Sequence, residues 1–156
     1  MTQIDECEQK EIQIEELARG VAGVCLCTRV RQLSRIITKL YDAAMRPFGI
    51  TASQYTLLTR IARRDGITQV EINAILDIEK STNARNFKRL VANGLITMDP
   101  PAGRRGRKTH LTPKGKVVIK EAYPAWKWAQ LEIVAAIGHD GRHAIDKLLV
   151  QLAKPE

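Results

Sequence analysis

Apolar side chains recur at three- and four-residue spacing over residues 24–45, which is the spacing of one face of an α-helix. The face consists of Leu26, Val30, Leu33, Ile37, Leu40 and Ala44. Pro47 follows and ends the pattern. Residues 1–18 are densely charged and predict an arm that frays or forms a short helix. Gly20 and Gly23 are expected to loosen the chain after this arm.

Capping residues locate the next two helices. Thr51 is a suitable N-cap for a helix that stops at Asp65 and Gly66. Thr68 is followed three residues later by Glu71, which is the pattern of a capping box. A third, short helix is therefore expected from this point.

A fourth helix is predicted to begin at residues 79–81 and to close at Asn93-Gly94, a common left-handed helix exit. Only residues 77 and 78 separate it from the third helix. Two short helices joined by such a brief turn form a helix-turn-helix.

Two short strands are predicted at residues 95–98 and 108–111, and the Pro-, Gly- and Arg-rich segment between them has the composition of a hairpin tip. A hairpin that follows a helix-turn-helix is the outline of a winged DNA-binding module.

A long helix is expected from Pro113 toward Ile137, since proline is favoured at the first helical position. Pro124 predicts a kink within it, and Gly138 is expected to end it. A last amphipathic helix is predicted over residues 142–153.

The composition favours one mainly helical domain. The chain has 156 residues, of which 44% are hydrophobic but only 4% aromatic, so the core is expected to consist of aliphatic side chains between helices. We therefore predict a mainly α fold: a winged helix-turn-helix with a small β-hairpin wing and helical segments from both termini.

The charge favours a polyanionic partner. The formal net charge is +8, although residues 1–17 contain six acidic side chains and one lysine. The remaining residues are therefore even more basic than the total indicates, as expected of a protein that binds double-stranded DNA.

The fourth helix has two faces that differ in chemistry. At 100° per residue, Ala84, Phe87, Leu90 and Val91 share one side and are expected to pack on the preceding helices. The opposite side and its flanks offer hydrogen-bond donors for DNA, namely Ser81, Thr82, Arg85, Asn86, Lys88 and Arg89. Arginine binds guanine in bidentate fashion and asparagine reads adenine. The alternative is a solvated charged face without a ligand.

Four cations lie close together in the hairpin: Arg104, Arg105, Arg107 and Lys108. Gly103 and Gly106 beside them let the backbone approach a ligand closely. Arginine side chains are favoured in narrow minor grooves, so the sequence predicts DNA contact here, with a solvated loop as the alternative.

Other function classes fit less well. We find no nucleophile with a base and an orienting group and no phosphate-cradling loop, so no enzyme and no cofactor are predicted. A peroxidase using Cys27 would not explain the helix and wing. A nonspecific architectural protein would explain the charge but not the polar face of the fourth helix. His139 and His143 have a possible metal spacing but lack a third ligand, so no metal site is predicted.

No apolar run approaches the roughly 20 residues that cross a bilayer, and the acidic amino terminus lacks the positive segment of a signal peptide, so a cytoplasmic protein without membrane contact is expected. Three cysteines, Cys7, Cys25 and Cys27, make a disulfide framework improbable.

Together, these segments resemble the multiple-antibiotic-resistance-regulator (MarR) family of dimeric winged helix-turn-helix repressors. The resemblance extends over residues 25–152. It rests on Arg35 and Tyr41, on Gly49-Ile50-Thr51-x-x-Gln54-Tyr55, on Thr82-x-x-Arg85-Asn86, on Asn93-Gly94-Leu95-Ile96 and on Leu111-Thr112-Pro113-Lys114-Gly115. The family wing carries Asp-x-Arg at its tip; here Gly103 stands in place of the aspartate and Arg105 matches the arginine.

The resemblance implies a homodimer that reads two half-sites of a pseudo-palindrome. Residues 21–50 and 113–156 would form the dimerisation region, residues 51–112 the DNA-binding domain and residues 1–20 an acidic arm. The apolar terminal helices agree with this division, since little else in the chain is available to cover them.

The family also implies a repressor released by a small aromatic or phenolic effector, held between the dimer helices and the winged domain. The candidate lining residues are Arg35, Tyr41, Trp126 and Trp128. The alternative for the two tryptophans is packing in the dimer core.

A branch of the family senses organic hydroperoxides through a cysteine, and the chain is similar to it at Cys27, Ser34-Arg35 and Tyr41. It departs from the branch at Arg31 and Ala52, where two further tyrosines usually stand. Cys25 and Cys27 lie where helix dipoles lower a thiol pKa, so a redox switch and structural thiols both stay open.

Overall fold

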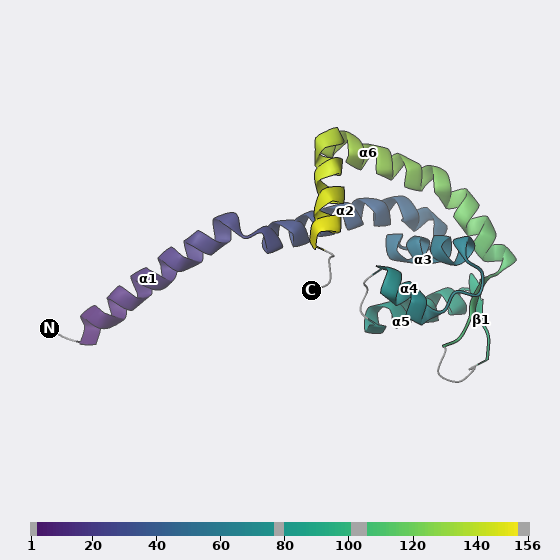
Figure 1. The fold of residues 1–156 in the computed structure, drawn as a ribbon, viewed down its shortest axis with the longest axis horizontal. Helices are drawn as coiled ribbons and strands as arrows, with labels where there is room; N and C mark the ends of the chain where they lie inside the picture. Colours follow the sequence, from purple (N-terminus) through teal and green to yellow (C-terminus); the bar gives the residue numbers. More distant parts are fainter. Residues whose placement is uncertain (1–2, 77–79, 101–105, 153–156) are drawn as a thin grey trace. The chain divides into compact units, whose positions relative to one another are not determined.

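The computed structural model describes residues 3–76, 80–100 and 106–152 (Figure 1), and its side chains are described from Ile14 onward. By their internal contacts the residues form two units, Met1–Ile37 and Thr38–Glu156. Each unit is described by itself below. None of the helices in the described ranges is long and apolar enough to span a membrane.

The first unit contains the helix α1 (Gln3–Val24) and the first part of α2 (Leu26–Met45). The expected amphipathic helix is confirmed as α2. The predicted loosening at Gly20 and Gly23 was wrong, because α1 runs through both residues. A glycine costs a helix about 1 kcal/mol relative to alanine, which weakens it without ending it. The break lies at Cys25 instead.

The second unit continues with a short 3₁₀ helix η1 (Arg46–Phe48) and with α3 (Ala52–Arg63). The predicted N-cap Thr51 is confirmed: its hydroxyl accepts a hydrogen bond from the Gln54 N–H at 3.3 Å, and the Gln54 side chain accepts one from the Thr51 N–H at 3.0 Å. This capping box satisfies two backbone donors that would otherwise lack partners in the first turn.

The two helices of the predicted helix-turn-helix are confirmed as α4 (Gln69–Leu76) and α5 (Lys80–Ala92), which contact each other. The predicted turn at residues 77 and 78 lies outside the described residues. Thr68 and Glu71 form the expected capping box at the start of α4. Beyond α5, Gly94 has φ 67°, the left-handed conformation that favours glycine after a helix.

The wing consists of β1 (Ile96–Met98) and β2 (Thr109–Leu111), as predicted. The strands are antiparallel and pair Ile96 with Leu111 and Met98 with Thr109. The predicted hairpin tip, residues 101–105, lies outside the described residues.

The last helix, α6 (Pro113–Leu152), starts at the predicted proline. It passes through Pro124 with helical backbone angles, and Gly138, with φ 69° and ψ 177°, interrupts it as predicted. Helical conformation resumes directly after Gly138, so the expected start of a separate helix at residue 142 was wrong.

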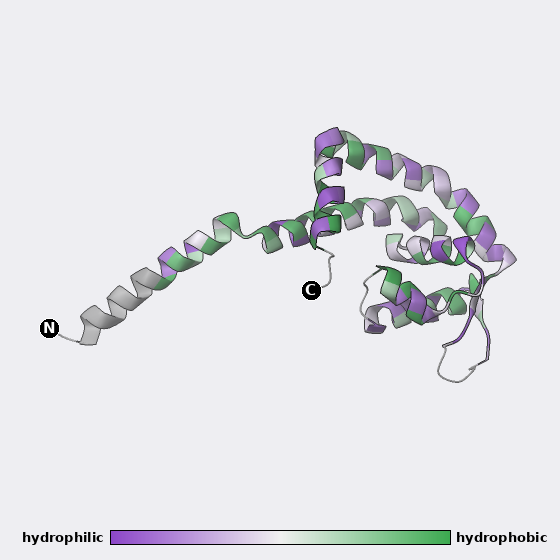
Figure 2. Cartoon of the chain, in the orientation of Figure 1, coloured by the Kyte–Doolittle hydropathy of each residue, from purple (hydrophilic) through white to green (hydrophobic). Residues whose placement is uncertain are grey.

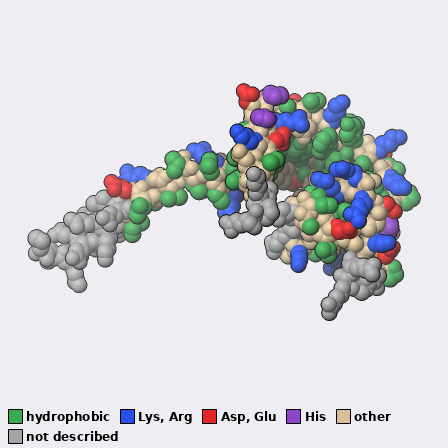
Figure 3. Space-filling view, in the orientation of Figure 1, with side chains coloured by type: hydrophobic (Ala, Val, Ile, Leu, Met, Phe, Trp, Pro, Cys, Tyr) green, Lys and Arg blue, Asp and Glu red, His purple; other side chains and the backbone are tan. Residues whose placement is uncertain are grey.

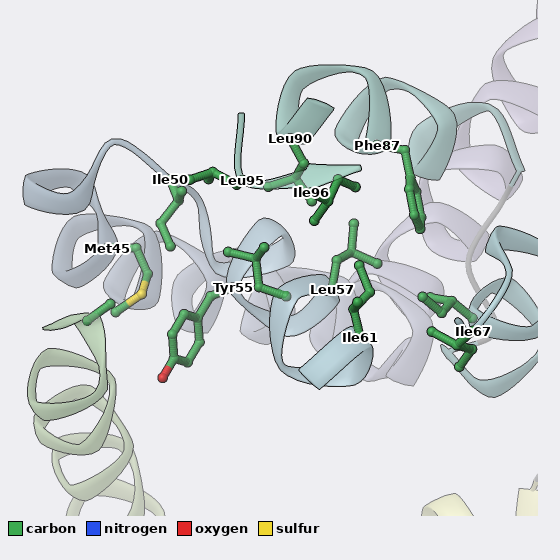
Figure 4. Packing of buried hydrophobic residues seen from close by; sticks show 13 residues of the cluster. Met45, Ile50, Tyr55, Leu57, Ile61, Ile67, Phe87, Leu90, Leu95 and Ile96 are labelled. Atoms are coloured by element: carbon green, nitrogen blue, oxygen red, sulfur yellow. The ribbon is translucent and has the colours of Figure 1, made fainter. Parts of the chain in front are cut away.

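A core of buried aliphatic and aromatic side chains joins α3, α4, α5, β1 and α6 (Figure 4). It consists of Met45, Ile50, Tyr55, Leu57, Leu58, Ile61, Ile67, Ile72, Phe87, Leu90, Leu95, Ile96 and Ala122. The mainly α fold with a small β-hairpin is thus confirmed, and its core fixes α5 and the wing in the same unit.

Candidate nucleic-acid interface

The helix α5 has one buried face and one solvent face. Phe87 and Leu90 are buried as predicted, together with Asn83. Ala84 is exposed and Val91 is 42% exposed, so their predicted packing role was wrong. The buried stripe follows positions 83, 87 and 90, and residues 84 and 91 lie at its edge.

The predicted polar side chains lie on the solvent face of α5. Five of the six residues are exposed and Asn86 is half-buried; the exposed ones are Ser81, Thr82, Arg85, Lys88 and Arg89. Their side chains are therefore placed where a ligand of the helix surface would meet them. This arrangement offers donors for base edges and phosphates along three turns of helix.

Asn83 connects α5 to α4 through a side-chain hydrogen bond, and the sequence reasoning did not predict this role. It is fully buried, and its Nδ2 donates a hydrogen bond to Oδ1 of Asn73 on α4. Its own Oδ1 has no hydrogen-bond partner within the described part of the chain. An asparagine four residues before Phe87, on the same stripe, is the sequence signal that could have revealed it.

The start of α4 is fixed by a carboxylate. Glu71 accepts hydrogen bonds from the Thr68 N–H and hydroxyl, both at 2.8 Å, and pairs with Arg64 at 2.7 Å. The Thr68 hydrogen bonds, with the nearby Arg64 charge, lower the pKa of Glu71 below its ordinary value. The carboxylate therefore stays ionised and keeps the turn before α4 closed.

The base of the wing is held by Arg107. Its Nε donates to the Asp99 carbonyl at 2.5 Å, and its Nη2 donates to the Met98 carbonyl at 3.2 Å. This is a structural role that the sequence reasoning did not assign. Lys108 is exposed beside it, whereas Arg104 and Arg105 lie outside the described residues.

The second strand of the wing also pairs with the segment before α4. The Gly66 N–H donates to the Thr109 carbonyl at 3.0 Å, and the Thr109 N–H donates to the Ile67 carbonyl at 3.2 Å. The buried Thr109 hydroxyl donates to the same Ile67 carbonyl. The wing is therefore attached to the helix-turn-helix by backbone hydrogen bonds.

His110 on β2 lies between two carboxylates. Its Nδ1 is 3.0 Å from Oδ1 of Asp65, and its Nε2 is 3.4 Å from Oδ1 of Asp99. The hydrogen bond with Asp65, and more weakly the negative charge of Asp99 nearby, raise the pKa of His110 above its ordinary value. No part of this arrangement was predicted from the sequence.

Basic side chains extend the cationic surface beyond α5 and the wing. Figure 3 shows Lys and Arg side chains gathered over α3, which carries Arg60 and Arg63 with Arg64 directly after it. Arg64 is paired with Glu71, so Arg60 and Arg63 are the two that add attraction for a polyanion next to the helix-turn-helix.

A cleft of about 450 Å³ lies between α3 and α6. Its lining residues are Tyr55, Thr56, Thr59, Arg60, Arg63, Tyr123 and Trp126. The Tyr123 and Trp126 rings are stacked, with centroids 5.9 Å apart and an interplanar angle of 20°. The cleft thus combines a stacked aromatic wall with two guanidinium groups.

Of the four predicted effector residues, only Trp126 lines this cleft. Tyr41 is half-buried, and its hydroxyl donates to Oε1 of Gln130 on α6. Trp128 is 56% exposed, and Arg35 is an exposed residue of α2 in the first unit. The two cleft arginines, Arg60 and Arg63, were not predicted.

Both described cysteines are free thiols at the junction of α1 and α2. Cys25 is half-buried and Cys27 is exposed. The side-chain hydrogen bond with Thr28 is the main cause that lowers the pKa of Cys25, with smaller contributions from backbone N–H groups and Arg31. The lowered pKa of Cys25 agrees with the expectation that a thiol at this helix start ionises readily.

Comparison with known proteins also points to a DNA-binding regulator. A sequence model described as "MarR family" matches residues 48–106. The chain is 26% identical to the uncharacterized HTH-type transcriptional regulator YwoH of Bacillus subtilis over 79% of its own length and 90% of YwoH. It is 30% identical to the multiple antibiotic resistance protein MarR of Salmonella typhimurium, but there spans 54% of itself and 60% of MarR.

Solved structures extend this likeness over most of the chain. The crystal structure of the transcriptional regulator MosR of M. tuberculosis is similar with a TM-score of 0.73 and 31% identity, covering 84% of this chain and 96% of MosR. The structure of MosR in complex with DNA gives a TM-score of 0.70 over 80% and 93% of the two chains, again at 31% identity. These relatives are transcriptional regulators, a role other than catalysis.

Proposed function

The chain belongs to the MarR family of transcriptional regulators, and we propose that it is a homodimeric repressor that binds a pseudo-palindromic operator and leaves it when a small ligand binds. The observation that carries this proposal is the division of α5 into a buried Asn83, Phe87 and Leu90 face and an exposed polar face. A helix anchored in this way presents its donors to the major groove as a rigid unit.

Arg85 is the base-reading residue of the proposal. It is exposed near the middle of the polar face, and arginine forms the commonest specific contact to guanine. Thr82 and Asn86 lie next to it on the same side and would contact neighbouring bases. Ser81, Lys88 and Arg89, at the ends and flank of the face, would bind phosphates and fix the register.

The wing is proposed to contact the adjacent minor groove and its phosphates. Arg104 and Arg105 carry this role from the sequence alone. Arg107 uses Nε and Nη2 at the base of the wing, which leaves its remaining N–H groups for a phosphate. Lys108 is exposed and would add a phosphate contact.

Homodimerisation is supported by apolar side chains that the single chain leaves exposed. In the first unit these are Ile14, Leu17, Val21, Val24, Leu26, Val30, Leu33 and Ile36. On the last turns of α6 they are Ile145, Leu148, Leu149, Val150 and Leu152. Figure 2 shows hydrophobic and hydrophilic residues alternating along these helices. Apolar stripes of this length favour burial against a second copy.

The α3–α6 cleft is the proposed effector site. Its stacked Tyr123 and Trp126 rings fit a planar aromatic group, while Arg60 and Arg63 fit a carboxylate or phenolate. A ligand that holds α3 and α6 at one separation shifts the dimer toward one spacing of its two α5 helices, provided that it binds that spacing better.

A thiol switch is the second candidate, and the lowered pKa of Cys25 beside the exposed Cys27 favours it. The sequence-based version assigns the peroxide reaction to Cys27, whose accessibility supports that choice. The lowered pKa of the Cys25 thiol instead favours Cys25 as the reacting residue. Replacement of each thiol by serine therefore separates the two assignments.

The proposal is tested by fluorescence anisotropy of the reduced full chain on duplex DNA from its own upstream region and on a scrambled duplex of the same length. We expect tighter binding to the upstream duplex, by about 10³-fold or more for a specific site. Equal affinity for both duplexes would contradict a sequence-specific regulator.

The same assay separates the two switching mechanisms. Organic hydroperoxide followed by a thiol reductant should release and restore the complex if a thiol is the switch, and the effect should vanish in Cys27→Ser or in Cys25→Ser. Binding that ignores peroxide in the wild type but responds to salicylate-like carboxylates, and loses that response in Arg60→Ala, would assign control to the cleft.

A further inference from the structure

His110 occupies a site that only its charged form satisfies. Its two ring nitrogens face two different carboxylates, Asp65 at 3.0 Å and Asp99 at 3.4 Å. A neutral imidazole has one N–H donor and one bare nitrogen, so it donates to only one carboxylate and turns a lone pair toward the other. The imidazolium donates to Asp65 and turns its second N–H and its positive charge toward Asp99, so the arrangement favours the protonated ring.

The three residues belong to three different segments. Asp65 lies in the turn between α3 and α4, Asp99 follows β1 directly, and His110 is the central residue of β2. We name this group the wing clasp. It links the start of the wing loop to the turn that leads into the helix-turn-helix, alongside the backbone hydrogen bonds of Gly66 and Thr109.

Among the described cations, none other than His110 forms an ion pair with the carboxylates of Asp65 and Asp99. Lys108 lies directly before β2, two residues before His110, and the stem of its side chain lies near Gly66. Arg107 donates to the Asp99 carbonyl rather than to the carboxylate. Arg64, beside Asp65, is paired with Glu71. The imidazole is therefore the cation that faces both carboxylates among the described residues.

We propose that the wing clasp positions the wing for DNA and that protonation of His110 makes operator binding depend on pH. The inference rests on the proposed DNA-binding function, and His110 acts as a positioning residue rather than a DNA contact. When the ring loses its proton, one carboxylate loses its donor and an uncompensated negative charge stands at the base of a wing that must approach phosphates.

The direction of the pH dependence follows from the linkage between proton binding to His110 and formation of the clasp. The clasp raises the His110 pKa, so the favourable arrangement is complete at low pH and is lost as the pH rises through that raised value. DNA near the wing stabilises the imidazolium further. Operator affinity should therefore fall as the pH rises through the raised pKa of His110.

The experiment measures operator affinity of the full chain by anisotropy between pH 5.8 and 8.2 at constant ionic strength, for wild type, His110→Gln and His143→Gln. We expect the wild-type dissociation constant to rise about three- to tenfold across this range. His110→Gln should bind at all pH values about as weakly as the wild type at pH 8.2. His143→Gln, which changes a histidine in the last part of α6, should keep the wild-type profile.

A second measurement keeps the inference testable if His110→Gln folds poorly. Asp99→Asn retains the histidine and removes one carboxylate, so it should lower the His110 pKa in an NMR titration of the ring protons and flatten the affinity profile. In the wild type, without DNA, His110 should titrate above the ordinary histidine pKa of 6.5.

Two failures can be told apart. A wild type that binds its upstream duplex specifically but with the same pH profile as His110→Gln would overturn the wing clasp and leave the regulator intact. So would a His110 that titrates at or below the ordinary histidine pKa of 6.5. A wild type with no specific DNA binding at pH 5.8 would overturn the proposed function, and with it the pH link to DNA.

Discussion

Gly115 on α6 lies against the backbone carbonyl of Leu95, so closely that a Cβ atom at position 115 would overlap the carbonyl oxygen. The contact is reinforced by Thr112, whose hydroxyl donates to the Gly94 carbonyl at 2.7 Å and accepts from the Gly115 N–H at 3.0 Å. The segment after the wing thus docks the start of α6 onto the turn that ends α5. This docking gives a physical reason for glycine at the end of the Leu-Thr-Pro-Lys-Gly motif.

Replacement of that glycine should destabilise the fold. Gly115→Ala forces α6 away from Leu95, and overpacking of this kind costs about 1–3 kcal/mol. Chemical denaturation followed by circular dichroism measures the change. Gly20→Ala is the matched control, since nothing lies within 4 Å of its added Cβ; it should leave stability unchanged or raise it by up to about 1 kcal/mol. A Gly115→Ala midpoint equal to the wild type would refute the close contact.

The Asn73–Asn83 hydrogen bond should be visible as an energetic coupling. Asn83→Ala removes a buried donor and leaves Asn73 with an unmatched acceptor, which costs about 1–3 kcal/mol. In a double-mutant cycle, Asn73→Ala should cost little once Asn83 is absent. Asn86→Ala, a half-buried asparagine on the same helix, should change the unfolding free energy by less than about 0.5 kcal/mol. Strict additivity of the Asn73 and Asn83 changes would exclude the coupling.

The Glu71 capping box makes stability depend on pH in a defined direction. Since the folded-state pKa of Glu71 is lowered, its contribution is present above the ordinary carboxyl pKa near 4.5 and is lost as the pH falls through the folded value. The wild type should therefore be more stable than Glu71→Gln at pH 7, and this difference should shrink as the pH falls below about 4. A stability difference that is the same at pH 7 and pH 3 would contradict the assignment.

The dimer proposal predicts a charge-sensitive apolar surface on the end of α6. Leu149→Lys places a charge on a residue that is 64% exposed in the single chain and should shift the protein toward monomers in analytical ultracentrifugation. Ile75→Lys, at an exposed apolar position of α4 outside the proposed interface, should leave the oligomeric state unchanged. Wild-type protein that sediments as a monomer at micromolar concentration would contradict the proposal.

Local signals account for what the sequence predicted correctly. The capping boxes at Thr51 and Thr68 and the glycine exit at Gly94 involve partners within a few residues, so spacing alone reveals them. The two strands follow from their length and the turn-forming residues between them. These features locate every element that carries the candidate interface.

Tertiary partners explain what the sequence did not reveal. Asn83 is polar and buried, and its Nδ2 finds a hydrogen-bond partner in Asn73 on the facing helix. His110 gains its role from Asp65, 45 residues away in the chain, and Arg107 from carbonyls across the hairpin. Trp126 and Trp128 are two residues apart on α6 and face different surroundings, so only one of them lines the cleft. Spacing within one element cannot encode such neighbours.

The central claim is that the polar face of α5 reads bases while the wing supplies attraction that is independent of sequence. The most direct measurement compares the affinities of wild type, Arg85→Ala and Arg105→Ala for the operator and for a scrambled duplex over a series of salt concentrations. Arg85→Ala should lower the ratio of specific to nonspecific affinity by about 1–3 kcal/mol, about 5- to 150-fold.

Arg105→Ala should weaken binding to both duplexes about equally and reduce the salt slope by about 1. An equal loss of specificity in the two variants, or an unchanged ratio in Arg85→Ala, would contradict the proposed base-reading face.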